Sequence, residues 1–253
     1  MGVKQKLKLL LVKFIPSKIK LEVERRFKFM VNPNHEAAPY INISFSQEGE
    51  DLVLARFIGN KSNGFYVDIG AHHPHRFSNT YKFYLNGWSG INIDALPGSK
   101  VLFDLKRPND INLEIDVLQN SDPVAVYHMF KESAFNSFDS AISEHRDQNT
   151  PDKIIEKRFI NTAPLSGILK SNLPPKTRID FFSIDVEGMD LDVLKSNDWA
   201  LYRPTYICLE SIGTSIQDDI ESLITQFLNE HHYSLVAKTM NSVFYKNLVS
   251  TDV

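Results

Sequence analysis

From residue 64 onward, short apolar runs alternate with segments of helical periodicity, and this alternation restricts the chain to few architectures. Strands are predicted where β-branched and aromatic residues cluster, and helices where apolar residues recur with helical spacing. Such alternation is typical of a mostly parallel sheet with helices on both faces. The predicted strands are 65–69, 90–94, 111–117, 180–185, 204–210, 233–239 and 242–246, and the predicted helices are 79–86, 99–106, 165–171, 189–196 and 217–231.

The end of the chain predicts a departure from the parallel pattern. Only Met240 and Asn241 separate the last two predicted strands, so these strands are expected to form an antiparallel hairpin. Residues 136–160 are rich in polar side chains, contain Pro151 and show no clean period, which indicates an insertion or a lid. We therefore expect one α/β core whose mostly parallel sheet ends in a C-terminal antiparallel hairpin.

The N-terminal region differs in composition from the rest of the chain. Residues 1–28 carry a net charge of +7, although the whole 253-residue chain has a net charge of −3. We predict a basic amphipathic helical arm over residues 1–40 and one globular domain over residues 41–253. Apolar residues recur at helical spacing in the arm, at Leu7, Leu10, Leu11 and Phe14.

Two roles are open for the arm. Packing or oligomerisation through residues 1–30 is favoured, because basic helices with a solvated face are common. Docking onto an anionic membrane surface is the alternative. No apolar run approaches the roughly 20 residues of a membrane span, and the single cysteine, Cys208, excludes an internal disulfide. We expect a cytoplasmic protein, peripheral at the inner face of the membrane if the arm binds lipid, with no nucleic-acid partner.

Three successive predicted strands end on carboxylates. Asp68 is followed by Gly70, whose missing side chain lets a ligand approach the turn closely. Asp94 lies 24 residues after Gly70, a spacing at which an acidic residue contacts ribose hydroxyls. Asp116 lies where an adenine amino group could be bound. A turn or cap role is the simpler interpretation of each aspartate alone, but all three in register favour an adenosine-type ligand.

The same strand ends argue against a dinucleotide. His72 stands near the position of the second glycine of the dinucleotide fingerprint, so a pyrophosphate would lose its backbone contact there. The three strand ends also offer no basic group for a phosphate. S-adenosylmethionine, which is a cation without phosphate, fits acidic walls better. A nicotinamide-dependent dehydrogenase is therefore the less favoured enzyme.

Four segments, in order, carry a specific family resemblance. They are FSQEGEDLVL (45–54), DIGAHHPHRFSNTY (68–81), GWSGINIDALPG (87–98) and FFSIDVEGMDLDVLKSNDW (181–199). Together they resemble the FkbM family of S-adenosylmethionine-dependent methyltransferases over about residues 45–210. The resemblance implies a class I methyltransferase fold, which is Rossmann-like, and O-methylation, often of sugars in polysaccharide or natural-product biosynthesis.

The resemblance also implies roles for individual residues. Asp68 and Gly70 are expected to line the methionine end of the cofactor, and Asp94 to bind the ribose, although the family often has glutamate at that position. Asp116 is a weaker candidate for adenine. A cover over the cofactor is expected from Gln47, Glu50 and Asp51, for which helix N-terminal capping is an equally good interpretation.

Transfer of a methyl group to an alkyl hydroxyl requires alignment and removal of the hydroxyl proton. Asp185 and Glu187 end the fourth predicted strand of the parallel series, and Glu210 ends the fifth. Carboxylates from adjacent strand ends form a hard oxygen site suited to Mg²⁺ or Mn²⁺, and Asp185 with Glu210 are the predicted metal ligands. The alternative is a metal-free site in which Asp185 or a histidine acts as the base.

Three histidines follow the first strand. His72 and His73 are adjacent, so their side chains diverge, and no cysteine or glutamate lies near in sequence to complete a zinc site with His75. A histidine metal site is therefore disfavoured. We expect His72 or His73 to face the acceptor as a base or hydrogen-bond partner, because an imidazole titrates near neutral pH.

These features predict an O-methyltransferase that uses S-adenosylmethionine to methylate a sugar hydroxyl. The acceptor is expected to be a sugar, a nucleotide-linked sugar or a growing glycan. A cofactor-binding module that has lost catalysis and serves a glycan assembly complex is the alternative from another functional class. The presence of Asp185, Glu187 and the histidines speaks against it.

Overall fold

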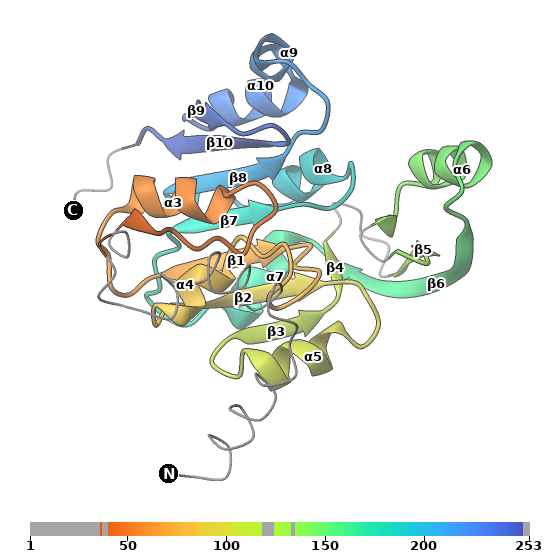
Figure 1. Cartoon of the computed structure of the whole chain (residues 1–253), viewed down its shortest axis with the longest axis horizontal. Helices are drawn as coiled ribbons and strands as arrows, with labels where there is room; N and C mark the ends of the chain where they lie inside the picture. The colour runs from red at the N-terminus through yellow and green to blue at the C-terminus, as the bar shows by residue number, and fades with distance from the viewer. Residues whose placement is uncertain (1–35, 37–39, 118–123, 133–134, 250–253) are drawn as a thin grey trace, which may run out of the picture. The chain divides into compact units, whose positions relative to one another are not determined.

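A single seven-stranded sheet organises the domain (Figure 1). Its strand order is β3-β2-β1-β7-β8-β10-β9, and the first five strands of this order run parallel. β10 is antiparallel to both β8 and β9, which confirms the C-terminal hairpin and the class I methyltransferase architecture. The strands are β1 Phe65–Ile69, β2 Ser89–Asp94, β3 Ile111–Glu114, β7 Phe181–Ile184, β8 Tyr206–Glu210, β9 Tyr233–Lys238 and β10 Ser242–Asn247.

The computed structural model describes residues 36, 40–117, 124–132 and 135–249. Almost all of the arm predicted over residues 1–40 therefore lies outside the described residues, and its roles stay predictions. Within the described ranges, no helix combines the length and hydrophobicity needed to cross a bilayer.

Alternation along the central strands builds two apolar layers, one on each side of the sheet. On β1, Val67 and Ile69 enter the larger layer, whereas Tyr66 enters the smaller one. The larger layer contains apolar residues of α7, α8 and α10, and the smaller layer contains residues of α3 and α4. The prediction of helices on both faces is confirmed. The helices are α3 Glu50–Ile58, α4 Tyr81–Leu85, α5 Ser99–Lys106, α6 Ser140–Asn149, α7 Leu165–Asn172, α8 Asp190–Lys195, α9 Ile216–Glu221 and α10 Leu223–Glu230.

Two predicted elements are divided in the structure. The prediction of a single helix over 217–231 is wrong, because Ser222 adopts an extended conformation with ψ 152° and divides the segment into α9 and α10. The Ser222 side chain accepts a hydrogen bond from the amide of Thr225 at the start of α10. The strand predicted over 111–117 is also divided. Its first part, Ile111–Glu114, pairs with β2 as β3, whereas Asp116 and Val117 pair with β6 as β4.

The predicted insertion forms a small sheet beside the main one. β4 Asp116–Val117, β5 Val124–Phe130 and β6 Ile154–Ala163 have the order β4-β6-β5, and α6 lies between β5 and β6 in sequence (Figure 1). The insertion therefore begins earlier than the predicted 136–160, because β5 pairs antiparallel with β6 over residues 154–161. We call this unit of β4, β5, α6 and β6 the insertion sheet.

The turn after β1 packs against the turn after β7 without room for a side chain. Gly70 has φ 77°, and a Cβ atom built on it would lie 1.8 Å from the carbonyl oxygen of Asp185. The amide of Asp185 donates to the carbonyl of Ile69, so the two turns are also joined by a hydrogen bond. Only glycine satisfies both the positive φ and this close approach.

Replacing Gly70 by alanine should therefore lower the free energy of unfolding by more than about 3 kcal/mol, because strain and a backbone clash add together. Gly87→Ala is the matched control, since Gly87 has φ 88° and a Cβ there would meet nothing within 4 Å. The control should lose only about 1 kcal/mol. Urea unfolding of the two variants measures both values, and equal losses would contradict the role given to the close approach.

Candidate active site

Five strands deliver carboxylates into one cavity of about 350 Å³. The cavity lies at the carboxyl ends of the parallel strands, beside the point between β1 and β7 where the strand order reverses, which is the usual ligand position in such sheets. Among the described residues that line it, Arg76 is the only lysine or arginine. Six acidic lining residues belong to these five strands or directly follow them, namely Asp68, Asp94, Asp116, Asp185, Glu187 and Glu210, and Glu132 follows β5.

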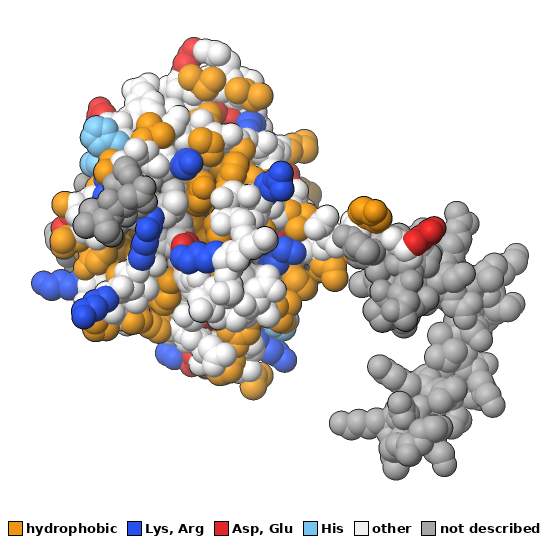
Figure 2. All heavy atoms as spheres, turned by 90° about the vertical axis from the view of Figure 1, so that its left-hand side faces the viewer, with side chains coloured by type: hydrophobic (Ala, Val, Ile, Leu, Met, Phe, Trp, Pro, Cys, Tyr) orange, Lys and Arg blue, Asp and Glu red, His pale blue; other side chains and the backbone are white. Residues whose placement is uncertain are grey.

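The opposite end of the sheet has a different character. The parallel strands begin at the left of Figure 1, and Figure 2 shows this face head-on. Lys and Arg side chains are spread over it among apolar and neutral groups, and few Asp and Glu side chains are visible. The concentration of carboxylates found in the cavity is therefore not repeated on this face.

Asp68 is held at the base of the cavity by hydroxyl groups. Its side chain accepts a hydrogen bond of 2.6 Å from the Thr80 hydroxyl and another from Ser183. Burial raises the pKa of Asp68, and the Thr80 hydrogen bond and the Arg107 charge oppose this rise. Ser183 precedes the catalytic candidates by only two positions, so Asp68 links the first strand to the fourth parallel strand, β7.

Asp94 binds two backbone amides in addition to facing the cavity. Its oxygens accept from the amide of His72 at 2.6 Å and from the amide of Leu96 at 2.7 Å. Each carboxylate oxygen has a second lone pair, so the group can still accept from a ligand. Burial raises the pKa of Asp94 to about 6.

Asp116 retains an unused acceptor. One carboxylate oxygen of this buried residue has no hydrogen-bond partner in the described structure, although the side chain lines the cavity. Burial, together with the charge of Asp94, raises the pKa of Asp116 to about 7. A buried carboxylate oxygen without a partner is costly, so a ligand that donates a hydrogen bond here would be stabilised.

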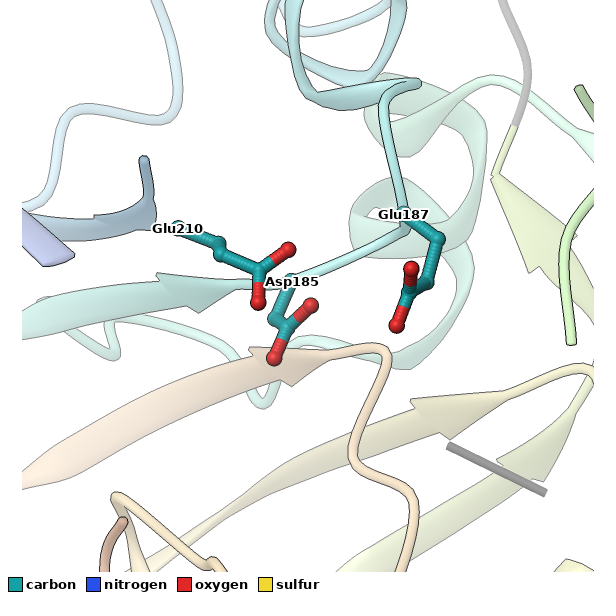
Figure 3. A group of neighbouring side chains, drawn as sticks. All are labelled: Asp185, Glu187 and Glu210. Atoms are coloured by element: carbon teal, nitrogen blue, oxygen red, sulfur yellow. The ribbon is translucent and has the colours of Figure 1, made fainter. Parts of the chain in front are cut away.

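Asp185, Glu187 and Glu210 form a compact carboxylate cluster, shown in Figure 3. One oxygen of each lies within 4.8 Å of the others. The Asp185 side chain is exposed to solvent within the cavity. Desolvation and the charge of Glu210 raise its pKa well above the usual range. Desolvation and the neighbouring acids raise the pKa of Glu210 to about 7. The prediction that these strand ends would meet is confirmed.

The insertion sheet supports Glu187 through Arg146, which lies outside the cavity lining, and through Ser137, which belongs to it. Arg146 of α6 lies 3.5 Å from the Glu187 carboxylate, and the Ser137 hydroxyl donates to the Glu187 carbonyl. Glu187 itself has φ 51°, a left-handed conformation that is uncommon for a residue with a side chain. Burial raises the pKa of Glu187, and Arg146 opposes this rise. Arg146 and Ser137 are missed by sequence reasoning, because they lie in a segment without a period.

The structure brings only some of the remaining predicted residues to the cavity. Gln47, Gly70 and His72 line it, and burial together with the charge of Arg76 lowers the pKa of His72, which favours the neutral imidazole. His73 does not line the cavity. Its Nδ1 accepts hydrogen bonds from the backbone amides of His75 and Arg76.

Asp51 also lies away from the cavity lining. It is fully buried and accepts hydrogen bonds from Ser44, Ser46 and the amide of Phe45. Glu50 binds Ser242 and the amide of Glu48. Both residues therefore organise the segment before α3, and the expected contact of Asp51 with a cofactor stays a prediction.

Three solved methyltransferase structures are similar to the chain at low sequence identity. A 1,6-didemethyltoxoflavin-N1-methyltransferase of Burkholderia thailandensis shares 10% identity over 98% of this chain and 91% of its own, with a TM-score of 0.41. A TehB-like methyltransferase of Corynebacterium glutamicum shares 8% over 88% and 98%, with a TM-score of 0.41. A precorrin-6y C5,15-methyltransferase of Geobacter metallireducens shares 10% over 78% and 88%, with a TM-score of 0.39.

No curated protein matches the chain. The family described as the methyltransferase FkbM domain matches residues 68–235, which include the carboxylates of all five strand ends. This match confirms the resemblance that the four sequence segments predicted. The chain belongs to the FkbM family of methyltransferases and is an S-adenosylmethionine-dependent methyltransferase.

Proposed function

We propose that this methyltransferase acts on oxygen, and that its acceptor is a hydroxyl group of a sugar. One observation carries the proposal: the cavity that accepts the cofactor also contains the cluster of Asp185, Glu187 and Glu210. Carboxylates can accept the proton of a hydroxyl and can hydrogen-bond to neighbouring hydroxyls of the same sugar. An acid-lined cavity also favours a neutral acceptor over an anionic one.

The cofactor uses the β1, β2 and β4 side of the cavity in this proposal. Asp68 binds the cationic methionine end beside Gly70, and Asp94 binds the ribose hydroxyls through the lone pairs that the amides of His72 and Leu96 leave free. Asp116 accepts the adenine amino group with its unpaired oxygen. Each of these carboxylates gains a hydrogen bond or a positive charge on binding.

The acceptor uses the side of the cavity where the end of β7 meets the segment between β5 and α6. Phe135 and Phe138 of this segment supply apolar walls there, and His72 also lines the cavity. The hydroxyl oxygen attacks the methyl carbon as the carbon–sulfur bond breaks, S-adenosylhomocysteine leaves, and a carboxylate takes the hydroxyl proton. Burial and the charge of Glu210 raise the pKa of Asp185, and a raised pKa makes its carboxylate a stronger base.

We further propose that Asp185, Glu187 and Glu210 hold a divalent cation such as Mg²⁺ or Mn²⁺. Their oxygens are hard ligands close enough to share one ion. A bound cation would lower the pKa of the acceptor hydroxyl. The raised pKa values of Asp185 and Glu210 reflect crowded negative charge that a cation would relieve. We also propose a cytoplasmic location, and an assembly or membrane-docking role for residues 1–30.

Replacing Asp94 by asparagine should weaken S-adenosylmethionine binding by about 1–3 kcal/mol, because a ribose hydroxyl loses its charged acceptor. Asp104→Asn is the matched control, since Asp104 lies exposed on α5 with Lys100 as its ion-pair partner. Calorimetry on both variants measures the effect. Unchanged affinity for Asp94→Asn, with the fold intact by circular dichroism, would remove Asp94 from the cofactor site.

Excess chelator should abolish methyl transfer to the acceptor and leave S-adenosylmethionine binding largely intact, and added Mg²⁺ or Mn²⁺ should restore turnover. Turnover is followed by mass spectrometry as the gain of one methyl group on a candidate sugar. Full activity in chelator would rule out the cation and assign proton removal to Asp185 or His72.

Replacing Glu210 by glutamine tests the metal-free case through the pH profile of kcat/KM. The charge of Glu210 raises the pKa of Asp185, so removing that charge should lower this pKa. The rise of activity with pH should then begin at a lower pH than in the wild type, with a smaller plateau because the base is weaker. Glu230→Gln, at the exposed end of α10, is the control. A profile that Glu210→Gln leaves unmoved would contradict Asp185 as the base.

A further inference from the structure

Arg107 is fully buried at the end of α5, which is unusual for a side chain that is always charged. Aromatic rings surround its guanidinium, with centroids 5.4 Å away for Tyr81 and Tyr84 and 5.8 Å away for Tyr66. Its nearest acidic partner, Asp110, lies 3.9 Å away and already accepts hydrogen bonds from Tyr66, Gly90 and Asn92. A direct carboxylate pair therefore does not account for most of the donors of Arg107.

The guanidinium instead donates to uncharged acceptors near the cavity. Thr80 receives hydrogen bonds of 2.9 and 3.0 Å from the two terminal nitrogens, and Asn92 receives one of 2.9 Å. Ser78 receives a longer one of 3.3 Å. Because the Thr80 oxygen accepts from Arg107, its single proton is directed elsewhere.

That proton points to the cofactor side of the cavity. The Thr80 hydroxyl donates to an oxygen of Asp68 at 2.6 Å, which is the shortest of its hydrogen bonds. Thr80 is itself fully buried, so water does not compete for the bond. A continuous chain of contacts thus runs from a buried cation on α5, through one hydroxyl, to a carboxylate that lines the active site.

We propose that Arg107 and Thr80 are positioning residues that hold the Asp68 carboxylate ionised and oriented for the cationic methionine end of the cofactor. The inference rests on the proposed role of Asp68 in cofactor binding. Neither residue lines the cavity, so they act through Asp68 and not on the ligand.

The groups around Asp68 have opposing effects on its pKa. Burial raises the pKa of Asp68, while Thr80, Arg107 and Ser183 lower it. Loss of the Thr80 donor would raise the pKa further, so that the carboxylate would be protonated at a higher pH. The other titratable groups that act on Asp68, or on which it acts, are Tyr66 of its own strand, Asp94 of β2, Asp110 after α5 and Cys208 of β8.

Thr80→Val tests the inference because valine keeps the shape of threonine and removes the donor. S-adenosylmethionine affinity, measured by calorimetry from pH 5 to 9, should fall about tenfold at neutral pH, and its acid-side loss should move to higher pH. Thr80→Ser should keep the wild-type profile. Thr225→Val is the matched control, since Thr225 is buried, bonds to Tyr245 at 2.6 Å and lies outside the cavity lining.

A stabilising role alone would lower the melting temperature of Thr80→Val and Thr225→Val alike and leave both pH profiles unmoved, which would overturn the inference. If Thr80→Val does not fold, Thr80→Ala carries the same expectation. Asp68→Asn distinguishes a failure of the positioning role from a failure of the cofactor-binding role of Asp68. If Asp68→Asn strongly lowers the affinity for S-adenosylmethionine but the pH profile of Thr80→Val is unchanged, only the positioning role is contradicted. If Asp68→Asn keeps full affinity, Asp68 is not part of the cofactor site, and the positioning role is contradicted as well.

Discussion

The contact between Gly70 and the backbone of Asp185 sets the geometry on which the rest of the site depends. The turns after β1 and β7 approach so closely that a single added carbon at Gly70 would lie 1.8 Å from the Asp185 carbonyl oxygen. This contact fixes the strand end that carries Asp68 against the strand end that carries the carboxylate cluster. In-line methyl transfer requires the sulfonium and the acceptor oxygen to lie on one axis. The close contact between these two turns fixes Asp68 relative to Asp185 and Glu187, and so supports such an alignment.

Folding brings acidic side chains together in the cavity, and their raised pKa values reflect the free-energy cost of ionising them there. Asp94, Asp116 and Glu210 have pKa values raised to about 6, 7 and 7, because burial and neighbouring acids disfavour their ionised forms. A cationic ligand reverses this effect by favouring ionisation. Binding of a cation should therefore release protons, and affinity should increase as pH rises through these values. The cavity therefore favours a cationic ligand over an anionic one.

Sequence reasoning located this cavity because parallel strands end at one edge of a sheet. Asp68, Asp94 and Asp185 each follow a strand with a clear apolar run, so their convergence could be predicted from the pattern alone. The division of the predicted 111–117 strand could not, because it depends on pairing between Asp116 and Thr162 of the distant β6. The role of His73 was also out of reach, since its Nδ1 is used by local backbone amides that a sequence pattern does not reveal.

The two arginines behind the carboxylates escaped prediction for a related reason. Arg107 belongs to the polar run Lys106-Arg107-Pro108-Asn109-Asp110, which is typical of a solvated turn, and Arg146 belongs to an insertion without a period. Tertiary packing alone places Arg107 behind Asp68, through Thr80, and places Arg146 3.5 Å from Glu187.

Both arginines stabilise ionised carboxylates from the protein side and leave the cavity side of those carboxylates open, because neither arginine lines the cavity. Arg76, the arginine that does line the cavity, pairs with Glu132 at 3.3 Å. An arginine directed from the cavity at Asp68 or Glu187 would neutralise these carboxylates and repel a sulfonium cation. Placed behind them, the same charge counteracts the pKa increase caused by burial while the front of each carboxylate remains available. The site can therefore be deeply buried and still present negative charge to its cofactor, which a cluster of buried acids without these cations would not do.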